Sequence, residues 1–270
     1  MPNSTINPWI QFYQPKPQAN LRLFCFPYAG GKAQIFRTWS EALPDQIEVY
    51  PIELPGHGRR WGETPFKQLP PLIEAVANAI APLLNRPYAL FGHSIGALIA
   101  FELARFLRQQ NASEPVHLFV SSRRAPQLQN SDTHSHTLPD DELIRKLCWL
   151  KGIPQNALDD PELMQLWLPI LRADLAVGET YTYVPQMPLS CPIIAFGGRQ
   201  DPAIRRGGLR QWREQTTGRF AKHLFRGNHF FLHSARPRFL KQLARVLQEE
   251  ISIRANRRSD SNGTENNALY

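Results

Sequence analysis

Short apolar runs alternate along the chain with segments long enough to form helices. Runs rich in β-branched and aromatic residues predict six strands, at Leu21–Phe26, Ile47–Ile52, Tyr88–Phe91, Val116–Ser121, Pro192–Phe196 and Phe220–Phe225. Several of these runs are apolar at consecutive positions, which is typical of strands buried on both faces of a parallel sheet. Helices that cover the faces are predicted at Pro71–Leu84 and Ile95–Gln109. The pattern indicates an α/β fold with an open, doubly wound, mostly parallel sheet.

The alternation stops between residues 123 and 188, where helical patterns follow one another. Three helices are predicted there, at Asp140–Leu150, Pro161–Leu171 and Ala173–Tyr183. We interpret residues 123–188 as a helical insertion in a single domain of residues 1–250. Residues 251–270 are rich in Arg, Ser and Asn, and we expect them to form a flexible tail.

Composition narrows the class of protein. Apolar residues make up 42% of the 270 positions and charged residues 20%, which excludes disordered and collagen-like classes. The 24 prolines exclude a long coiled coil. The 31 Lys and Arg residues against 23 Asp and Glu give a net charge of +8, which favours an acidic partner without identifying it.

Cysteine usage and the N-terminal residues indicate a cytoplasmic location. The cysteines are odd in number, lie far apart and show no metal-ligand spacing (Cys25, Cys148 and Cys191). The first twenty residues lack the basic start and apolar run of a signal peptide. The longest mostly apolar stretch, Ala89–Ala104, is interrupted by polar residues and is too short to span a bilayer. We expect no membrane segment.

Gly92-His93-Ser94-Ile95-Gly96 follows a predicted strand and precedes a long apolar helix. This G-x-S-x-G sequence in a strand–turn–helix context predicts a nucleophile elbow. Glycines on both sides of the serine let neighbouring backbone pass closely, and the helix start presents free N–H groups. The same letters also occur in plain Gly-Ser turns, so the flanking strand and helix carry the prediction that Ser94 is a nucleophile.

A serine hydroxyl needs a base, and hydrolases of this fold place an acid and then a histidine after the serine. Asp201 follows the strand at Pro192–Phe196, and His229 follows the strand at Phe220–Phe225. We predict that His229 is the base and that Asp201 orients it. Asp174 is the rival acid, which we interpret as structural or lid-associated. The remaining histidines are interpreted as surface or packing residues: His57, His93, His117, His134, His136, His223 and His233.

An oxyanion hole is the third requirement, because the tetrahedral intermediate carries negative charge. The Ile95 N–H, directly after the serine, is one predicted donor. The second is assigned to the Ala29 N–H, in the Gly-containing loop after the first strand, with Tyr28 as the alternative. A plain Gly-Gly turn without this role is the other interpretation of the loop.

The motifs together resemble the type II thioesterases, the free-standing partners of nonribosomal peptide and polyketide synthases. The resemblance spans about residues 21–250 in family order: Phe26–Gly31, Leu54–Arg60, Gly92–Ala97, Leu171–Asp174 with Glu179–Tyr181, Gly197–Asp201 and Gly227–Phe231. It implies the α/β-hydrolase fold and hydrolysis of acyl or aminoacyl thioesters on the phosphopantetheine arm of carrier domains, which clears misloaded or stalled groups. It implies no metal and no bound cofactor, because pantetheine arrives on the substrate. We expect a monomer that binds no nucleic acid.

The resemblance also identifies the insertion as a lid over an acyl and pantetheine channel. Its apolar residues either line that channel or form a plain core: Trp149, Leu150, Leu163, Met164 and Trp167. We take Tyr28, Trp149, Met164 and Trp167 as candidate substrate-binding residues. One departure is His57, which stands where family members often have Arg in Leu-Pro-Gly-Arg-Gly.

Other functions remain open to a chain with these residues. A carboxylesterase or lipase would act on small oxygen esters, and an acyltransferase would use the same triad to acylate an alcohol or amine. A carrier-binding protein without activity would need only a surface, and the predicted triad argues against it.

Overall fold

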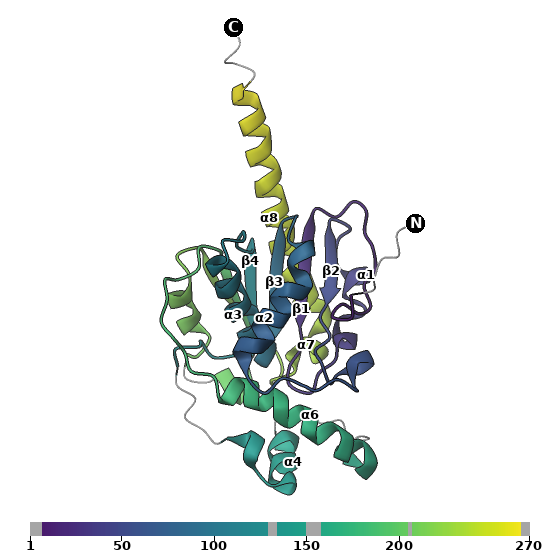
Figure 1. Cartoon of the computed structure of the whole chain (residues 1–270). Coiled ribbons are helices and arrows are strands. Elements are labelled where there is room, and N and C mark those ends of the chain that lie inside the picture. The colour runs from purple at the N-terminus through teal and green to yellow at the C-terminus, as the bar shows by residue number, and fades with distance from the viewer. Residues whose placement is uncertain (1–6, 129–133, 150–157, 205–206, 266–270) are drawn as a thin grey trace, which may run out of the picture.

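The structure, a computed structural model, describes residues 7–128, 134–149, 158–204 and 207–265. Six parallel strands form one sheet in the order β2-β1-β3-β4-β5-β6 (Figure 1). Their bounds are β1 Leu21–Phe26, β2 Ile47–Pro51, β3 Tyr88–His93, β4 His117–Ser121, β5 Ile193–Gly198 and β6 Phe220–Phe225. The predicted doubly wound sheet is confirmed. Because the strand order reverses between β1 and β3, a crevice is expected outside the carboxyl ends of these two strands.

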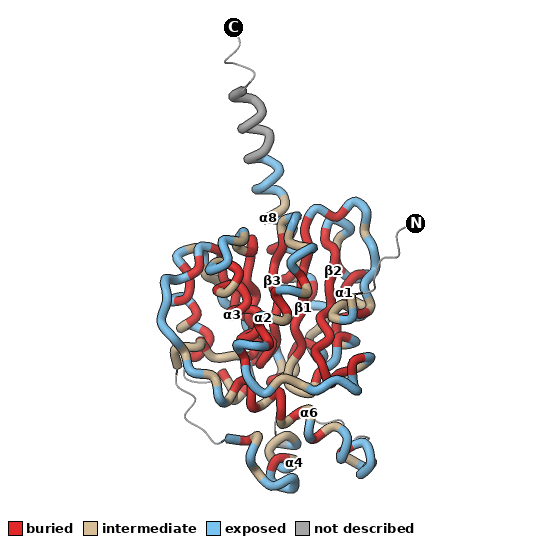
Figure 2. Tube along the Cα trace, viewed as in Figure 1, coloured by how far each residue is buried: buried red, intermediate tan, exposed pale blue. Residues whose placement is uncertain are grey.

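Both faces of the sheet are covered, which explains the consecutive apolar positions of the strands (Figure 2). Side chains alternate along each strand: Phe24 and Phe26 of β1 pack with α2 and α3, whereas Leu23 and Cys25 pack with α1 and α8. The covering helices are α1 Trp39–Ala42, α2 Leu69–Ile80, α3 Ile95–Gln109, α7 Phe231–Ser234 and α8 Arg236–Glu265.

The insertion forms helices α4, Asp140–Trp149, and α6, Pro161–Glu179, at one end of the sheet (Figure 1). The sequence predicted two helices over residues 161–183, but the structure forms the single helix α6 with Pro169 inside it. Proline costs a backbone hydrogen bond. Here the helix continues through it because Leu168 and Leu171, on either side of the proline, are buried in one apolar cluster with Leu143 of α4.

The last helix runs into the segment that was expected to be a tail. Residues from 251 were expected to form a flexible tail, but α8 continues to Glu265. An ion pair between Arg254 and Glu250, one turn apart at 2.8 Å, supports this extension. Leu247 is the last fully buried residue of α8, Ile251 packs against the edge of the core, and residues 252–256 are exposed. None of the helices in the described part of the chain combines the length and apolar character needed to cross a membrane.

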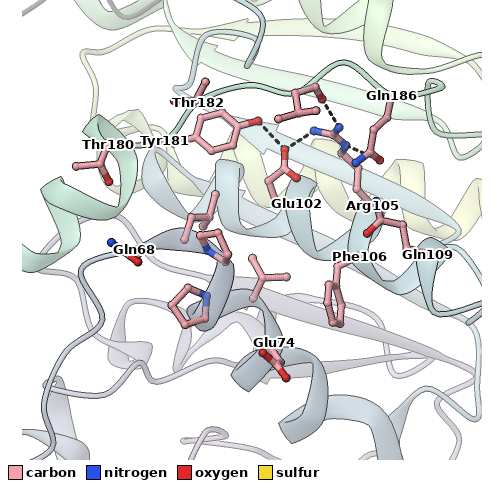
Figure 3. A pocket seen from close by; sticks show the side chains of 15 residues that line it. Gln68, Glu74, Glu102, Arg105, Phe106, Gln109, Thr180, Tyr181, Thr182 and Gln186 are labelled. Carbon is pink, nitrogen blue, oxygen red and sulfur yellow. Dashed lines mark hydrogen bonds and ion pairs between the residues drawn. The ribbon is translucent and has the colours of Figure 1, made fainter.

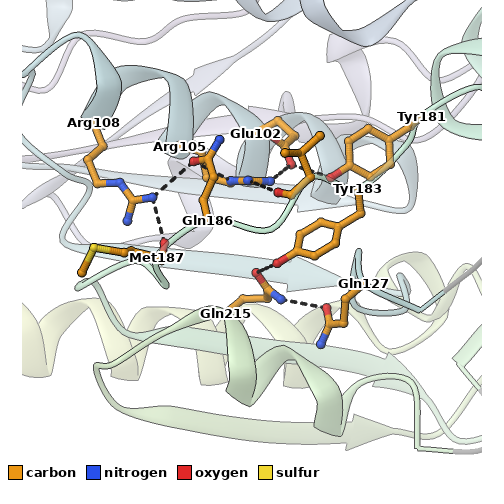
Figure 4. A network of polar contacts seen from close by, with 10 residues as sticks. Glu102, Arg105, Arg108, Gln127, Tyr181, Tyr183, Gln186, Met187 and Gln215 are labelled. Atoms are coloured by element: carbon orange, nitrogen blue, oxygen red, sulfur yellow. Dashed lines mark hydrogen bonds and ion pairs between the residues drawn. The ribbon is translucent and has the colours of Figure 1, made fainter.

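A buried ion pair holds the segment that returns from α6 to β5 against α3. Arg105 of α3 is 3% exposed and donates a hydrogen bond of 2.6 Å to Glu102. Tyr181 donates to the same carboxylate at 2.6 Å, and Arg105 also donates to the Val184 carbonyl (Figure 4). A cavity of about 780 Å³ lies beside these groups, between the start of α2, α3 and residues 180–186 (Figure 3). The network therefore fixes the segment that follows α6 to the helix that begins next to Ser94.

Replacing Arg105 with Met should lower the free energy of unfolding by about 3–5 kcal/mol, because Glu102 would lose its buried cationic partner. Urea unfolding measures the change. Arg245→Met is the matched control, since Arg245 and Glu249 form an ion pair whose side chains are 60% and 59% exposed. That loss should stay within about 1 kcal/mol. Equal losses in the two variants would show that the Arg105 network adds no more than a surface pair.

Candidate active site

Ser94 occupies a strained turn between β3 and α3. Its φ is 57° and its ψ is −116°, a backbone conformation that costs energy for a residue with a side chain. A Cβ atom at Gly92 would lie 2.0 Å from the Gly96 carbonyl oxygen, and one at Gly96 would lie 2.3 Å from that of Phe26. The backbone therefore passes too closely for any other residue at these two positions. This is the geometry that the sequence predicted for a nucleophile elbow.

Asp201 and His229 meet beyond the carboxyl ends of β5 and β6. The Nδ1 atom of His229 lies 3.1 Å from each carboxylate oxygen of Asp201. Both residues are buried, and Asp201 Oδ1 also accepts a hydrogen bond of 2.9 Å from the Ala203 N–H. Because the carboxylate only accepts, His229 carries its proton on Nδ1, and Nε2 of the neutral ring is left as the basic atom.

One pocket of about 250 Å³ brings the predicted groups together. Its wall includes Ser94, His229, Ala29 and Ile95, so the predicted nucleophile, base and two oxyanion donors share one cavity. Ile95 is the first residue of α3, whose first-turn N–H groups have no acceptor within the helix. Chemically, this arrangement can activate a hydroxyl and hold an oxyanion, which is what acyl transfer requires.

Tyr28, the alternative to Ala29, lies away from this pocket. Its ring packs edge-on against His93 and Phe230, and its hydroxyl is 3.0 Å from Nε2 of His233. Burial raises the pKa of Tyr28 to about 12, so the phenol stays neutral. The Tyr28 side chain therefore packs against His93, Phe230 and His233 and does not border the cavity with Ser94.

The candidate lid residues also lie elsewhere. Met164 is buried with Leu168 and Leu171 in the lid's own apolar cluster, as a plain core residue would be. Trp167 packs on that cluster and donates from Nε1 to the Gly30 carbonyl at 3.2 Å. Leu163 is 44% exposed. The side chain of Trp149 and all of Leu150 fall outside the described residues.

Other residues of the insertion line the pocket, and sequence reasoning missed them. Leu143 and Leu147 of α4 contribute apolar surface, together with Leu175 of α6. The first two are spaced one helical turn apart, a signal that was available in the sequence. Cations line the wall as well: Arg123, Arg124 and Lys146. Burial lowers the pKa of Arg123 to about 10, which still leaves it charged at neutral pH.

His57 and Asp174 form a second buried His–carboxylate pair beside the pocket. The Nε2 atom of His57 lies 2.9 Å from Asp174 Oδ2, and its Nδ1 lies 3.1 Å from the Pro55 carbonyl oxygen. Burial lowers the pKa of His57, but the Asp174 charge and the hydrogen bonds to these oxygens outweigh it and raise the pKa overall. Asp174 is therefore engaged with His57, whereas His229 is engaged with Asp201.

Comparison with known proteins identifies similar chains. The family model described as the thioesterase domain matches residues 21–247. The gramicidin S biosynthesis protein GrsT of Aneurinibacillus migulanus is 45% identical over 252 residues, which cover 92% of this chain and 98% of GrsT. The RedJ thioesterase of the Streptomyces coelicolor prodiginine pathway has a TM-score of 0.80 at 44% identity, covering 84% of this chain and 90% of RedJ. The type II thioesterase BorB of the borrelidin cluster has a TM-score of 0.76 at 37% identity, covering 88% of this chain and 96% of BorB.

Proposed function

This chain belongs to the thioesterase family, and we propose that it hydrolyses acyl or aminoacyl thioesters on the phosphopantetheine arm of carrier domains. Its relatives include type II thioesterases of nonribosomal peptide and polyketide pathways, so its task is to remove misloaded or stalled groups from such a synthase. The pocket that Ser94 and His229 share under the helical insertion is the observation that carries this proposal.

Acylation begins when His229 Nε2 takes the proton of Ser94 and the serine oxygen attacks the thioester carbonyl carbon. The N–H groups of Ala29 and Ile95 hold the oxyanion of the tetrahedral intermediate. The carbon–sulfur bond then breaks, and the pantetheine sulfur leaves with the proton from His229. Asp201 stays ionised and stabilises the imidazolium.

In deacylation water is the nucleophile and Ser94 is the leaving group. His229 deprotonates a water molecule, which attacks the acyl-serine ester through a second tetrahedral intermediate. The free acid leaves, and Ser94 recovers its proton from His229. The chain supplies the nucleophile of the first stage and the base and oxyanion donors of both, so we propose that the reaction needs no bound cofactor.

Mass spectrometry of an acylated carrier protein incubated with the enzyme tests this function. Hydrolysis releases free acid and leaves the carrier with a bare pantetheine thiol. An acyltransferase would instead require an alcohol or amine acceptor before the carrier lost its acyl group. A carrier that keeps its acyl group, while a small oxygen ester is hydrolysed, would favour a general esterase.

Surface charge should make the carrier reaction depend on salt. The net charge of +8 favours encounter with an acidic carrier surface, which raises the association rate more than the final affinity. We expect kcat/KM for an acyl carrier protein to fall markedly from low to high salt, because the Debye length is only about 10 Å at 0.1 M. The same acyl group on a short pantetheine thioester is the control and should change little. Equal salt dependence would mean that the surface charge does not recruit the carrier.

A further inference from the structure

Helix α6 of the insertion makes hydrogen bonds with Gly30, the residue that follows the proposed oxyanion donor Ala29. Asp174 Oδ2 accepts a hydrogen bond of 2.7 Å from the Gly30 N–H. The Gly30 carbonyl accepts one of 3.2 Å from Trp167 Nε1. A Cβ atom at Gly30 would lie 2.5 Å from the Trp167 ring, so the loop and helix are in close contact. One helix thus binds both backbone polar groups of Gly30.

These contacts select one form of a turn. Residues 28–31 are closed by a hydrogen bond of 2.8 Å from the Gly31 N–H to the Tyr28 carbonyl, and Gly30 has a φ of 71°. A positive φ at the third position is typical of a type II turn, which differs from type I by a flip of the central peptide. That central peptide joins Ala29 to Gly30, and Asp174 accepts its N–H. Flipping it would turn the Ala29 carbonyl, instead of an N–H, toward the carboxylate.

His57 forms an ion pair with Asp174 in a buried place. The exposed fraction is 6% for Asp174 and 2% for His57, and a lone carboxylate at this depth would be costly. Both ring nitrogens of His57 face oxygen acceptors, so the ring is held as an imidazolium. The carboxylate of Glu53 also acts favourably on the charged ring. The Gly30 N–H therefore meets an ionised acceptor, which makes a stronger hydrogen bond than a neutral one.

We propose that Asp174, paired with His57, is a positioning residue that locks the 28–31 turn and so holds the Ala29 amide where the oxyanion forms. This inference rests on the proposed function. It also gives His57 a role as the partner of Asp174, at the position where the chain departs from the family's Leu-Pro-Gly-Arg-Gly motif.

Asp174→Asn tests the inference through two readouts. The first is hydrolysis of a short pantetheine thioester. The second is affinity for an alkylboronic acid, whose tetrahedral adduct with Ser94 places an oxygen in the oxyanion hole. Outright loss of one donor costs roughly 10²–10³ in kcat, and a loosened donor should cost less, about 10- to 100-fold. We expect boronate affinity to fall by a similar factor while KM changes less than about threefold, because the lost interaction forms only in the transition state.

His136→Gln is the matched control. His136, in the segment before α4, and Glu179, the last residue of α6, form another His–carboxylate pair, with Nδ1 and Oε2 at 2.7 Å. Neither residue has a hydrogen bond to Gly30 among the described residues. This variant should keep boronate affinity within about threefold of wild type. His57→Gln should follow Asp174→Asn in both readouts, and it keeps the test decisive if Asp174→Asn fails to fold.

Two results would overturn the inference and can be told apart. If Asp174→Asn and His57→Gln lower thermal stability as His136→Gln does, yet retain boronate affinity, the pair is only structural and the proposed function stands. If the wild-type enzyme neither binds the boronate nor hydrolyses the thioester, the proposed function itself fails.

Discussion

Ser94→Ala should abolish acyl-enzyme formation and lower thioester turnover by roughly 10⁶-fold, the scale on which loss of a serine nucleophile has been measured in a serine protease. The variant keeps the binding pocket and the backbone of the turn, but no oxygen remains to attack the carbonyl. A fluorophosphonate probe, which labels activated serines, measures the loss directly, and a thioester assay measures turnover.

Folding must be unchanged for this result to carry weight. Alanine and serine meet the same backbone strain at a φ of 57°, so the thermal unfolding midpoint should stay close to that of wild type. Labelling of the Ala variant at the wild-type level would place the reactive serine elsewhere and refute the assignment.

Asp201→Asn should lower kcat by roughly 10⁴-fold with little change in fold. An amide NH₂ facing Nδ1 of His229 favours the tautomer protonated on Nε2, and that tautomer cannot accept the serine proton. Steady-state kinetics on a pantetheine thioester measures the loss. Asp174→Asn is the matched comparison, because it neutralises the other buried carboxylate that pairs with a histidine. Its expected loss is about 100-fold at most. If Asp174→Asn were the more damaging variant, with folding controlled, the catalytic acid would be misassigned.

Local signals in the sequence were sufficient to predict the sheet and the nucleophile turn. Strand β1 was predicted with the bounds that the structure shows, because a run buried on both faces leaves a continuous apolar pattern. The turn at Ser94 was predictable because two close backbone contacts require glycine at fixed spacing from the serine. Asp201 and His229 could be placed because parallel strands end at one edge of the sheet, which brings the loops that follow them together.

Contacts between distant segments left no such signal. His57 and Asp174 are 117 residues apart, and neither belongs to a pattern that predicts the other. The choice of channel-lining residues in the insertion was wrong for a related reason. Periodicity shows that a helix has an apolar face, but it does not show what that face contacts. Met164 and Trp167 were candidates for the substrate channel, and the structure uses them for packing inside the lid and for holding Gly30. A boundary between two helices was predicted at residue 172, yet one helix runs over Pro161–Glu179, with buried leucines on both sides of Pro169.

The course of α8 determines how the enzyme can be attached to other objects. Its C-terminal half leaves the body of the molecule at the end opposite to α4 and α6 (Figure 1). Ser252 and Ile253 on this half are exposed and make no contact with the pocket that holds Ser94. A dye, a bead or a second enzyme coupled there would leave α4 and α6 facing solution, so immobilisation through α8 keeps the end of the molecule that holds the Ser94 pocket accessible to a bulky substrate.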